Sequence, residues 1–160
     1  SEKTEVFSYE QMADDLDVLI KKLKLKNAYI IGFSDGAIVA LMLAIKYPSL
    51  FDKMVVLGPN LSIEGLEEDF LNTYGLSDDP YTRMMMNQKP IPLYDLKQIE
   101  SEVLLCGGSK DLIKQTHLND IAQHLRKGKK VIFENEDHFS YLNKDALLEV
   151  LIAFLNASSI

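Results

Sequence analysis

The chain has 160 residues, of which 47% are apolar and 26% are charged, and its formal net charge is −7. This length suggests one domain, and the apolar share is sufficient for a hydrophobic core. The negative charge argues against binding to nucleic acid or to anionic membranes, because both partners require a basic surface. No apolar run is long enough to span a membrane, and we expect no signal peptide in the polar residues 1–5. The single cysteine, Cys106, cannot form an internal disulfide, and we therefore expect a cytoplasmic protein.

The first predicted helix begins after Ser8, which is a typical capping residue with Gln11 three positions later. Apolar residues then recur at helical spacing as far as Leu23, so we expect an amphipathic helix. Residues 28–32 are short, apolar and bounded by polar residues, which predicts a buried strand.

Residues 37–45 are apolar on all sides, which predicts a helix that is buried on most sides and that ends before Pro48. A second strand is predicted at residues 53–57. From residue 60 to residue 99 the periodicity weakens, and glycines and prolines become frequent. We interpret this segment, 60–99, as a cap-like insertion of short helices and loops. Its run Met84–Met86 suits either ordinary packing, which we favour, or the lining of an adaptable substrate pocket.

Regular patterns return after residue 100. Strands are predicted at residues 102–106 and 130–133, and helices around residues 118–125 and 147–155. This alternation predicts an α/β fold, with a mostly parallel sheet of about four strands and helices on both faces. We expect a single domain over residues 1–160, with its core in residues 1–59 and 100–160. Cys106 lies in a predicted strand, and we interpret it as a core residue.

The strongest chemical signal is the sequence Gly32-Phe33-Ser34-Asp35-Gly36, a G-x-S-x-G motif between a predicted strand and a predicted helix. A nucleophile elbow has this context, because a tight strand-to-helix turn exposes the serine hydroxyl at the carboxyl end of the sheet. We expect Gly32 and Gly36 to relieve crowding around the turn. The backbone N–H of Asp35 would be one donor to an oxyanion near the helix N-terminus.

A nucleophilic serine requires a base, and that base requires an acid to orient it. Among the three histidines, His138 follows the last predicted strand, at the sheet edge where the motif is expected. His117 and His124 are predicted to be half-exposed on an amphipathic helix. Asp111 follows the preceding strand, so the chain order is Ser, Asp, His.

Three other acidic residues compete with Asp111 for this role. They are Glu134, Glu136 and Asp137. We favour Asp111, because Asp137 is adjacent to His138 and neighbouring side chains in an extended loop usually diverge.

These motifs resemble the α/β-hydrolase superfamily, and in particular small bacterial hydrolases similar to prolyl aminopeptidases and carboxylesterases. The resemblance covers essentially the whole chain, and is carried by residues 9–16, the motif at 32–36, residues 108–113 and residues 137–139. It implies that Ser34 is the nucleophile, a role that aspartate or cysteine takes in some other members.

The resemblance also implies that an N-terminal part of the fold is missing. Family members carry several strands before the helix that begins near Ser8, and a loop after one of them supplies a second oxyanion donor. Without these strands, the strand at residues 28–32 lies at a sheet edge, and activity could be impaired. An apolar edge strand invites association, so we expect a homo-oligomer that covers this edge.

We therefore expect a serine-type hydrolase that acts on a small ester or amide through Ser34, His138 and Asp111. No cofactor and no metal are expected, because the chain has no phosphate loop, metal cluster or dinucleotide motif. The alternative is a truncated, catalytically silent module that persists as an oligomer.

Overall fold

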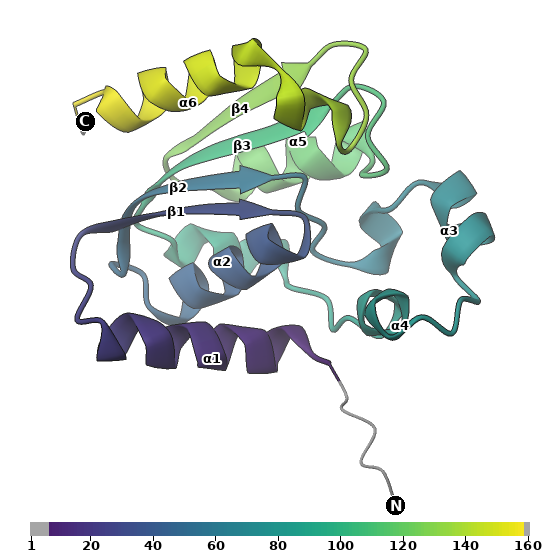
Figure 1. The fold of residues 1–160 in the computed structure, drawn as a ribbon, viewed down its shortest axis with the longest axis horizontal. Coiled ribbons are helices and arrows are strands. Elements are labelled where there is room, and N and C mark those ends of the chain that lie inside the picture. The colour runs from purple at the N-terminus through teal and green to yellow at the C-terminus, as the bar shows by residue number, and fades with distance from the viewer. Residues whose placement is uncertain (1–6, 159–160) are drawn as a thin grey trace, which may run out of the picture.

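The computed structural model describes residues 7–158, so the polar segment 1–5 lies outside the described residues. Its centre is a sheet of four parallel strands in the order β1 (Ala28–Phe33), β2 (Phe51–Leu57), β3 (Glu102–Gly108) and β4 (Gly128–Phe133). Parallel strands need crossover connections, and helices cover both faces of this sheet (Figure 1). The α/β architecture with a four-stranded parallel sheet is as expected from the sequence.

Four longer helices make the two outer layers. They are α1 (Tyr9–Lys22), α2 (Asp35–Lys46), α5 (Gln115–His124) and α6 (Asp145–Asn156). Helices α2 and α5 lie against one face of the sheet, with α1 outside α2, and α6 lies against the other face (Figure 1). Among the helices of residues 7–158, none has the length and apolar character that crossing a membrane requires.

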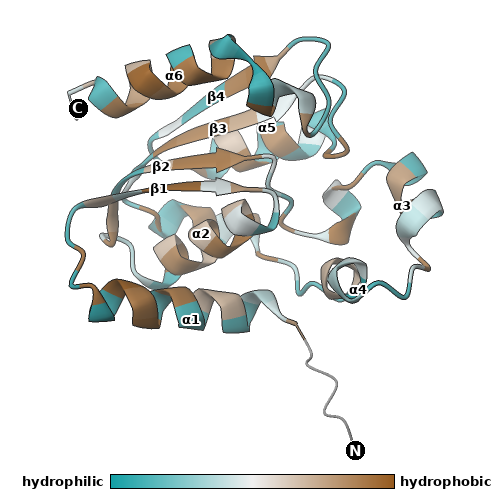
Figure 2. Cartoon of the chain, viewed as in Figure 1, coloured by the Kyte–Doolittle hydropathy of each residue, from teal (hydrophilic) through white to brown (hydrophobic). Residues whose placement is uncertain are grey.

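Helix α1 begins at the predicted cap, where the Ser8 hydroxyl accepts a hydrogen bond from the N–H of Gln11 at 3.1 Å. Its apolar side packs against α2, and Figure 2 shows hydrophobic and hydrophilic residues alternating along α1. The buried stripe is narrower than the sequence predicts, because Leu19 and Leu23 are 50% and 58% exposed. The helix packs mainly on α2, which covers only part of its apolar surface.

Strand β1 differs from the expectation of a buried strand. It lies at one edge of the sheet, and Tyr29 and Ile31 are 52% and 51% exposed, whereas Ile30 packs in the core under α2. Ile31 shares its face with Val55, its partner in β2, which is fully buried in the core beside α6. Helix α6 therefore covers this face of the sheet from β2 to β4, and leaves the same face of β1 open.

Lys53 is a buried charge in β2, with a side chain that is 1% exposed. Its ammonium group donates hydrogen bonds to the carbonyl oxygens of Phe154 at 2.8 Å and Leu155 at 3.3 Å, at the end of α6. A helix C-terminus carries unpaired carbonyls and a partial negative charge, so a cation stabilises it. This contact fixes α6 on the sheet.

Between β2 and β3 the chain forms a cap beyond the carboxyl ends of the strands (Figure 1). The short helices beyond these ends are η1 (Ile63–Gly65), α3 (Glu68–Tyr74) and α4 (Pro80–Met86), whereas η2 (Leu93–Gln98) packs against α2 and α5. An isolated bridge between Leu66 and Ile113 attaches the cap to the loop after β3. Residues 60–99 form short helices and loops, and their role as a cap-like insertion stays a prediction.

Candidate active site

Ser34 lies in the turn between β1 and α2, with backbone angles of φ 51° and ψ −116°. A non-glycine residue in this region is strained, by about 1 to 3 kcal/mol, and such strain collects at functional sites. The turn is held because the Ser34 N–H donates to the carbonyl of Leu57 at 2.8 Å and the Ser34 carbonyl accepts from Ala37 at 2.9 Å. The geometry is that of a tight strand-to-helix elbow that presents a serine hydroxyl.

The two glycines of the motif are not equivalent. A Cβ atom at Gly32 would lie 2.4 Å from the carbonyl oxygen of Gly36, so only glycine fits there. A Cβ atom at Gly36 would meet nothing within 4 Å in this chain. The expectation that both glycines relieve crowding is therefore correct for Gly32 and wrong for Gly36, which lies on the open side of the first turn of α2.

Asp111 is held in the loop after β3. One carboxylate oxygen, Oδ2, accepts a hydrogen bond from the N–H of Gly108 at 3.2 Å, and the other, Oδ1, accepts from the N–H of Ile113 at 3.1 Å. The residue is only 6% exposed. Two backbone donors satisfy the buried carboxylate and fix its direction, so it can orient a third group without moving.

His138, in the loop after β4, connects Asp111 with Ser34. Its Nδ1 lies 2.7 Å from Oδ1 of Asp111, and its Nε2 lies 3.0 Å from the hydroxyl oxygen of Ser34. A carboxylate beside Nδ1 selects the tautomer with the proton on Nδ1, which leaves Nε2 free to accept the proton of the serine. The structure thus brings together the three side chains that the sequence singled out, and His138 is 3% exposed.

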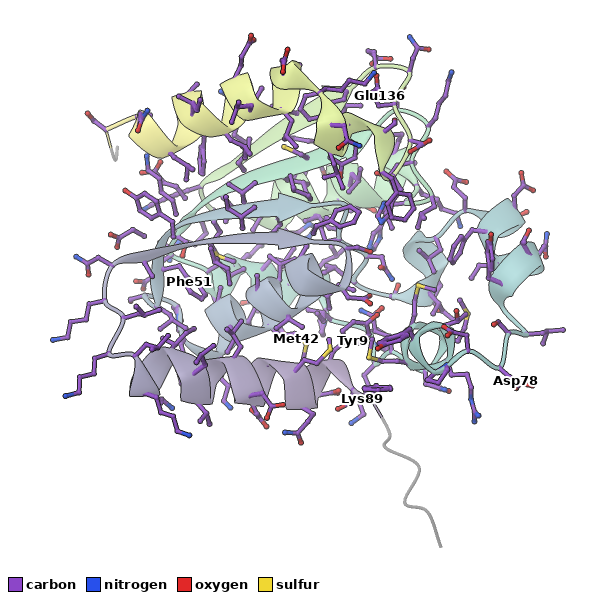
Figure 3. The ribbon with its side chains drawn as sticks, viewed as in Figure 1. Tyr9, Met42, Phe51, Asp78, Lys89 and Glu136 are labelled. Carbon is purple, nitrogen blue, oxygen red and sulfur yellow. The ribbon has the colours of Figure 1, made fainter. Side chains whose placement is uncertain are left out.

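Two of the rival acidic residues, Glu136 and Asp137, have other partners. Asp137 Oδ1 accepts from the N–H groups of Phe139 and Ser140, both at 2.8 Å, and these bonds lower the pKa of Asp137. Glu136 pairs with Lys144 at 3.1 Å near the start of α6 (Figure 3). Asp111 is the acidic residue that contacts His138 through a hydrogen bond.

Three groups surround the imidazole of His138. The rings of Phe33 and Phe139 lie with their centroids 4.9 and 5.0 Å away, the second edge-on at 86°. On another side, a Cβ atom at Gly58 would lie 2.7 Å from Cε1 of His138. Gly58 has a φ of 58°, so both its backbone and this close approach require glycine. In the sequence, only the pair Gly58-Pro59 after β2 distinguishes this position, and its contact with His138 was not predicted.

Tyr9 is a second residue beside the site that was not predicted from the sequence. Its hydroxyl donates a hydrogen bond to Oδ1 of Asp35 at 2.7 Å, and its side chain is 3% exposed at the start of α1 (Figure 3). Burial, together with the Asp35 carboxylate, raises the pKa of Tyr9 above its usual range. The neutral hydroxyl therefore remains a donor and ties α1 to the residue that follows Ser34.

The backbone N–H of Asp35 lies in the first turn of α2. N–H groups in a first helical turn have no partner within the helix and carry a partial positive charge. The structure thus leaves the Asp35 N–H without a helical acceptor beside Ser34, so its assignment as an oxyanion donor stays a prediction.

Ser34 and His138 open into a pocket of about 700 Å³ between the core and the cap. The cap contributes Phe70 and Tyr74 from α3 and Met85 from α4. Met84, in contrast, is 6% exposed in the core. The methionine run therefore divides between packing, which we favoured, and the pocket.

The other two histidines lie outside this pocket on α5. Nε2 of His117 accepts a hydrogen bond from the N–H of Leu61 at 2.9 Å, and Nδ1 of His124 lies 2.8 Å from the carbonyl of Asp120. His117 is half-buried, as expected, but its contact with the cap was not predicted. Cys106 is fully buried, and burial raises the pKa of its thiol to about 12, which agrees with a core role.

A family model described as alpha/beta hydrolase fold matches residues 1–82. This segment contains the elbow, whereas Asp111 and His138 lie beyond it. Among curated proteins, the chain is similar to a serine hydrolase, BPHL, from Homo sapiens and from Mus musculus, with 41% identity over 70 residues in each case. That segment is 44% of this chain and 23% of each relative.

Several solved structures share the fold. A carboxylesterase structure from Nitrososphaera gargenis has a TM-score of 0.78 and 16% identity over 96% of this chain and 73% of its own. A meta-cleavage product hydrolase from Pseudomonas fluorescens, CumD, has a TM-score of 0.77 and 15% identity over 96% and 74%. An esterase from Exiguobacterium antarcticum has a TM-score of 0.73 and 17% identity over 95% and 75%. At these identities the likeness concerns the fold alone.

Proposed function

Because the chain belongs to the α/β-hydrolase fold family, we propose that it is a serine-type hydrolase that cleaves a small ester or amide. The observation that carries the proposal is the chain of contacts from Ser34 through His138 to Asp111, with distances of 3.0 and 2.7 Å. A serine, a histidine and a carboxylate in this order form the arrangement that activates a hydroxyl for acyl transfer. The similarity to a curated serine hydrolase over 70 residues supports the same reaction class.

In the proposed reaction, Oγ of Ser34 forms a bond to the carbonyl carbon of the substrate while Nε2 of His138 takes the serine proton. The Asp111 carboxylate stabilises the imidazolium that results. The tetrahedral intermediate then collapses, the bond to the leaving alcohol or amine breaks, and His138 returns the proton to that group. Water then attacks the carbonyl carbon of the acyl-enzyme while His138 takes its proton. Collapse of this second intermediate releases the acid, and His138 returns the proton to Ser34.

The oxyanion of the intermediate would be stabilised by the N–H of Asp35 at the start of α2. Loss of one oxyanion donor typically costs about 100- to 1,000-fold in turnover. The family resemblance assigns a second donor to a loop after an earlier strand, so turnover by this chain depends on a second donor beside Ser34.

A fluorophosphonate probe tests the proposal, because it reacts with an activated serine whatever the natural substrate. We expect one label per folded chain, located at Ser34 by peptide mapping, and its loss in Ser34→Ala and in His138→Ala. His124→Ala provides the matched control, because it removes a histidine outside the pocket and should leave the label in place. Folded protein that stays unlabelled would refute the proposal and favour the silent module.

A further inference from the structure

Aromatic side chains that are about half exposed or more line the pocket beside Ser34. Tyr74, Tyr81 and Phe139 line it and are 49%, 60% and 61% exposed. Each is held in place by another ring: Tyr74 by Phe70 at 5.0 Å and Tyr81 by Phe7 at 5.1 Å, while Phe139 lies edge-on to His138. Exposed apolar groups that line one concave surface indicate a binding site for an apolar group.

The charges around the same pocket are unequal. Outside the Asp111–His138 pair, its lining includes one cation, Lys110, and four carboxylates. The carboxylates are Asp35, Glu67, Asp69 and Asp137. Asp35 and Asp137 have the hydrogen bonds described above, whereas Glu67 and Asp69 lie exposed at the start of α3, at the rim.

From these two observations we infer that the substrate is a carboxylic ester with an apolar, uncharged acyl chain, and that the rim excludes acyl chains that end in a carboxylate. The inference rests on the proposed function and names the substrate class for it. The ring faces of Tyr74, Tyr81 and Phe139 suit an apolar chain, and burial of a charge against them is costly. The excess of negative charge at the rim adds repulsion before the substrate reaches Ser34.

Coulomb's law gives the electrostatic part of the discrimination against an anionic acyl chain. Two unit charges about 8 Å apart in a water-like dielectric change a binding constant by about two- to threefold. An excess of three negative charges, from four carboxylates and one lysine, therefore gives about tenfold discrimination against an anion at low salt. Salt should weaken this part, since the Debye length falls to about 10 Å at 0.1 M and about 3 Å at 1 M.

The test compares para-nitrophenyl pentanoate with para-nitrophenyl hydrogen glutarate, which carries a carboxylate in place of the terminal methyl group. The leaving group is the same, and the charge lies three methylene groups from the reacting carbonyl. After subtraction of spontaneous hydrolysis, we expect kcat/KM to be at least about tenfold higher for the neutral ester at low salt. The ratio should narrow as salt rises to about 0.5 M.

Variants separate the rim charges from the apolar wall. The double variant Glu67→Gln, Asp69→Asn removes two of the repelling charges. It should lower the ratio of kcat/KM for the neutral ester to kcat/KM for the anionic ester by about fivefold. Glu68→Gln is the matched control, since Glu68 lies between them in the sequence, is exposed and does not line the pocket. It should leave the ratio unchanged.

Fluorophosphonate labelling distinguishes the two possible failures. If Ser34 is labelled but the two esters react equally well, or if Glu68→Gln narrows the ratio as much as the double variant does, the inference is wrong and the proposed function stands. If Ser34 is not labelled in the folded chain, both are wrong.

Discussion

The backbone on either side of Ser34 shows how little space the elbow leaves. At Gly32 a methyl group would overlap the carbonyl of Gly36, and that carbonyl belongs to the backbone and cannot rotate away. At Gly36 the same methyl group would meet nothing within 4 Å, and the residue is helical. Of the two positions, Gly32 therefore excludes a side chain and Gly36 has room for one.

We expect Gly32→Ala to destabilise the protein by more than about 2 kcal/mol, because the turn must open to admit the Cβ atom. Gly36→Ala should be neutral or stabilising by up to about 1 kcal/mol, because alanine favours a helix. Urea unfolding of the two variants beside the wild type measures both effects. If both variants lose the same free energy of unfolding, the space beside Gly36 is filled in the protein in solution.

Gly58 is the second position where a single methyl group matters. Its Cβ atom would lie 2.7 Å from Cε1 and 3.0 Å from Nδ1 of His138. We expect Gly58→Ala to push the imidazole away from Ser34 and Asp111. A displacement of about 1 Å can cost about 100-fold in rate. Steady-state kinetics should therefore show a lower kcat with a nearly unchanged KM, and fluorophosphonate labelling of Ser34 should slow.

A control for this substitution must carry the same backbone strain. Asn27 has a φ of 51° and precedes β1, at the end of the sheet opposite Ser34, so Asn27→Ala places alanine in a comparable conformation. It should lose stability but keep the labelling rate. If both variants label at the same rate, Gly58 acts through the stability of the fold and not through His138.

At the scale of elements, His117 connects α5 with the cap. Its Nε2 accepts the N–H of Leu61, so this nitrogen must be unprotonated in the folded state. Burial is the main cause that lowers the pKa of His117 below its usual value. Below about pH 6.5 the unfolded chain binds a proton at this residue while the folded chain resists it. The free energy of unfolding therefore decreases as the pH falls through this range.

We expect urea unfolding to show a loss of stability between about pH 7.5 and about pH 5.5 that is smaller in His117→Gln, because glutamine does not titrate. Hydrogen exchange at the Leu61 amide should accelerate over the same range in the wild type. A wild type and variant with parallel pH profiles would show that protonation of His117 does not affect the attachment of the cap.

At the scale of the whole molecule, residues 7–158 leave one face and the outer edge of β1 open. Tyr29 and Ile31 are half exposed there, on the face where α6 covers β2 to β4. The edge also presents unpaired backbone donors and acceptors. Two copies of β1 can pair antiparallel about a two-fold axis, because such an interface uses the same surface twice. We propose a homodimer of this kind.

Sedimentation velocity tests the dimer across a range of concentrations. We expect Tyr29→Lys combined with Ile31→Lys to shift the protein to monomer, because lysines on an edge strand oppose pairing. Leu76→Lys is the matched control, since Leu76 is fully exposed in the loop between α3 and α4 and should not affect assembly. A wild type that stays monomeric at every concentration would exclude the proposal.

The elements and the order of the site residues could be predicted from the sequence because their signals are local. Apolar runs of strand length, separated by amphipathic segments, predicted the parallel sheet. In such a sheet the carboxyl ends of all strands meet at one edge, so Ser34, Asp111 and His138 could be placed there as residues that follow strands. Which acid contacts His138 remained a preference among neighbours until the distances were known.

The contacts that the sequence left undetermined join residues far apart in the chain. Tyr9 and Asp35 are separated by 26 positions, and Leu61 and His117 by 56. No periodicity records such pairs, because each depends on how helices and loops pack against one another. The exposure of β1 and the open space beside Gly36 are of the same kind. By itself the sequence determined which residues follow which strands, and the tertiary structure decided which side chains meet and which surfaces stay open, because contacts depend on packing between elements.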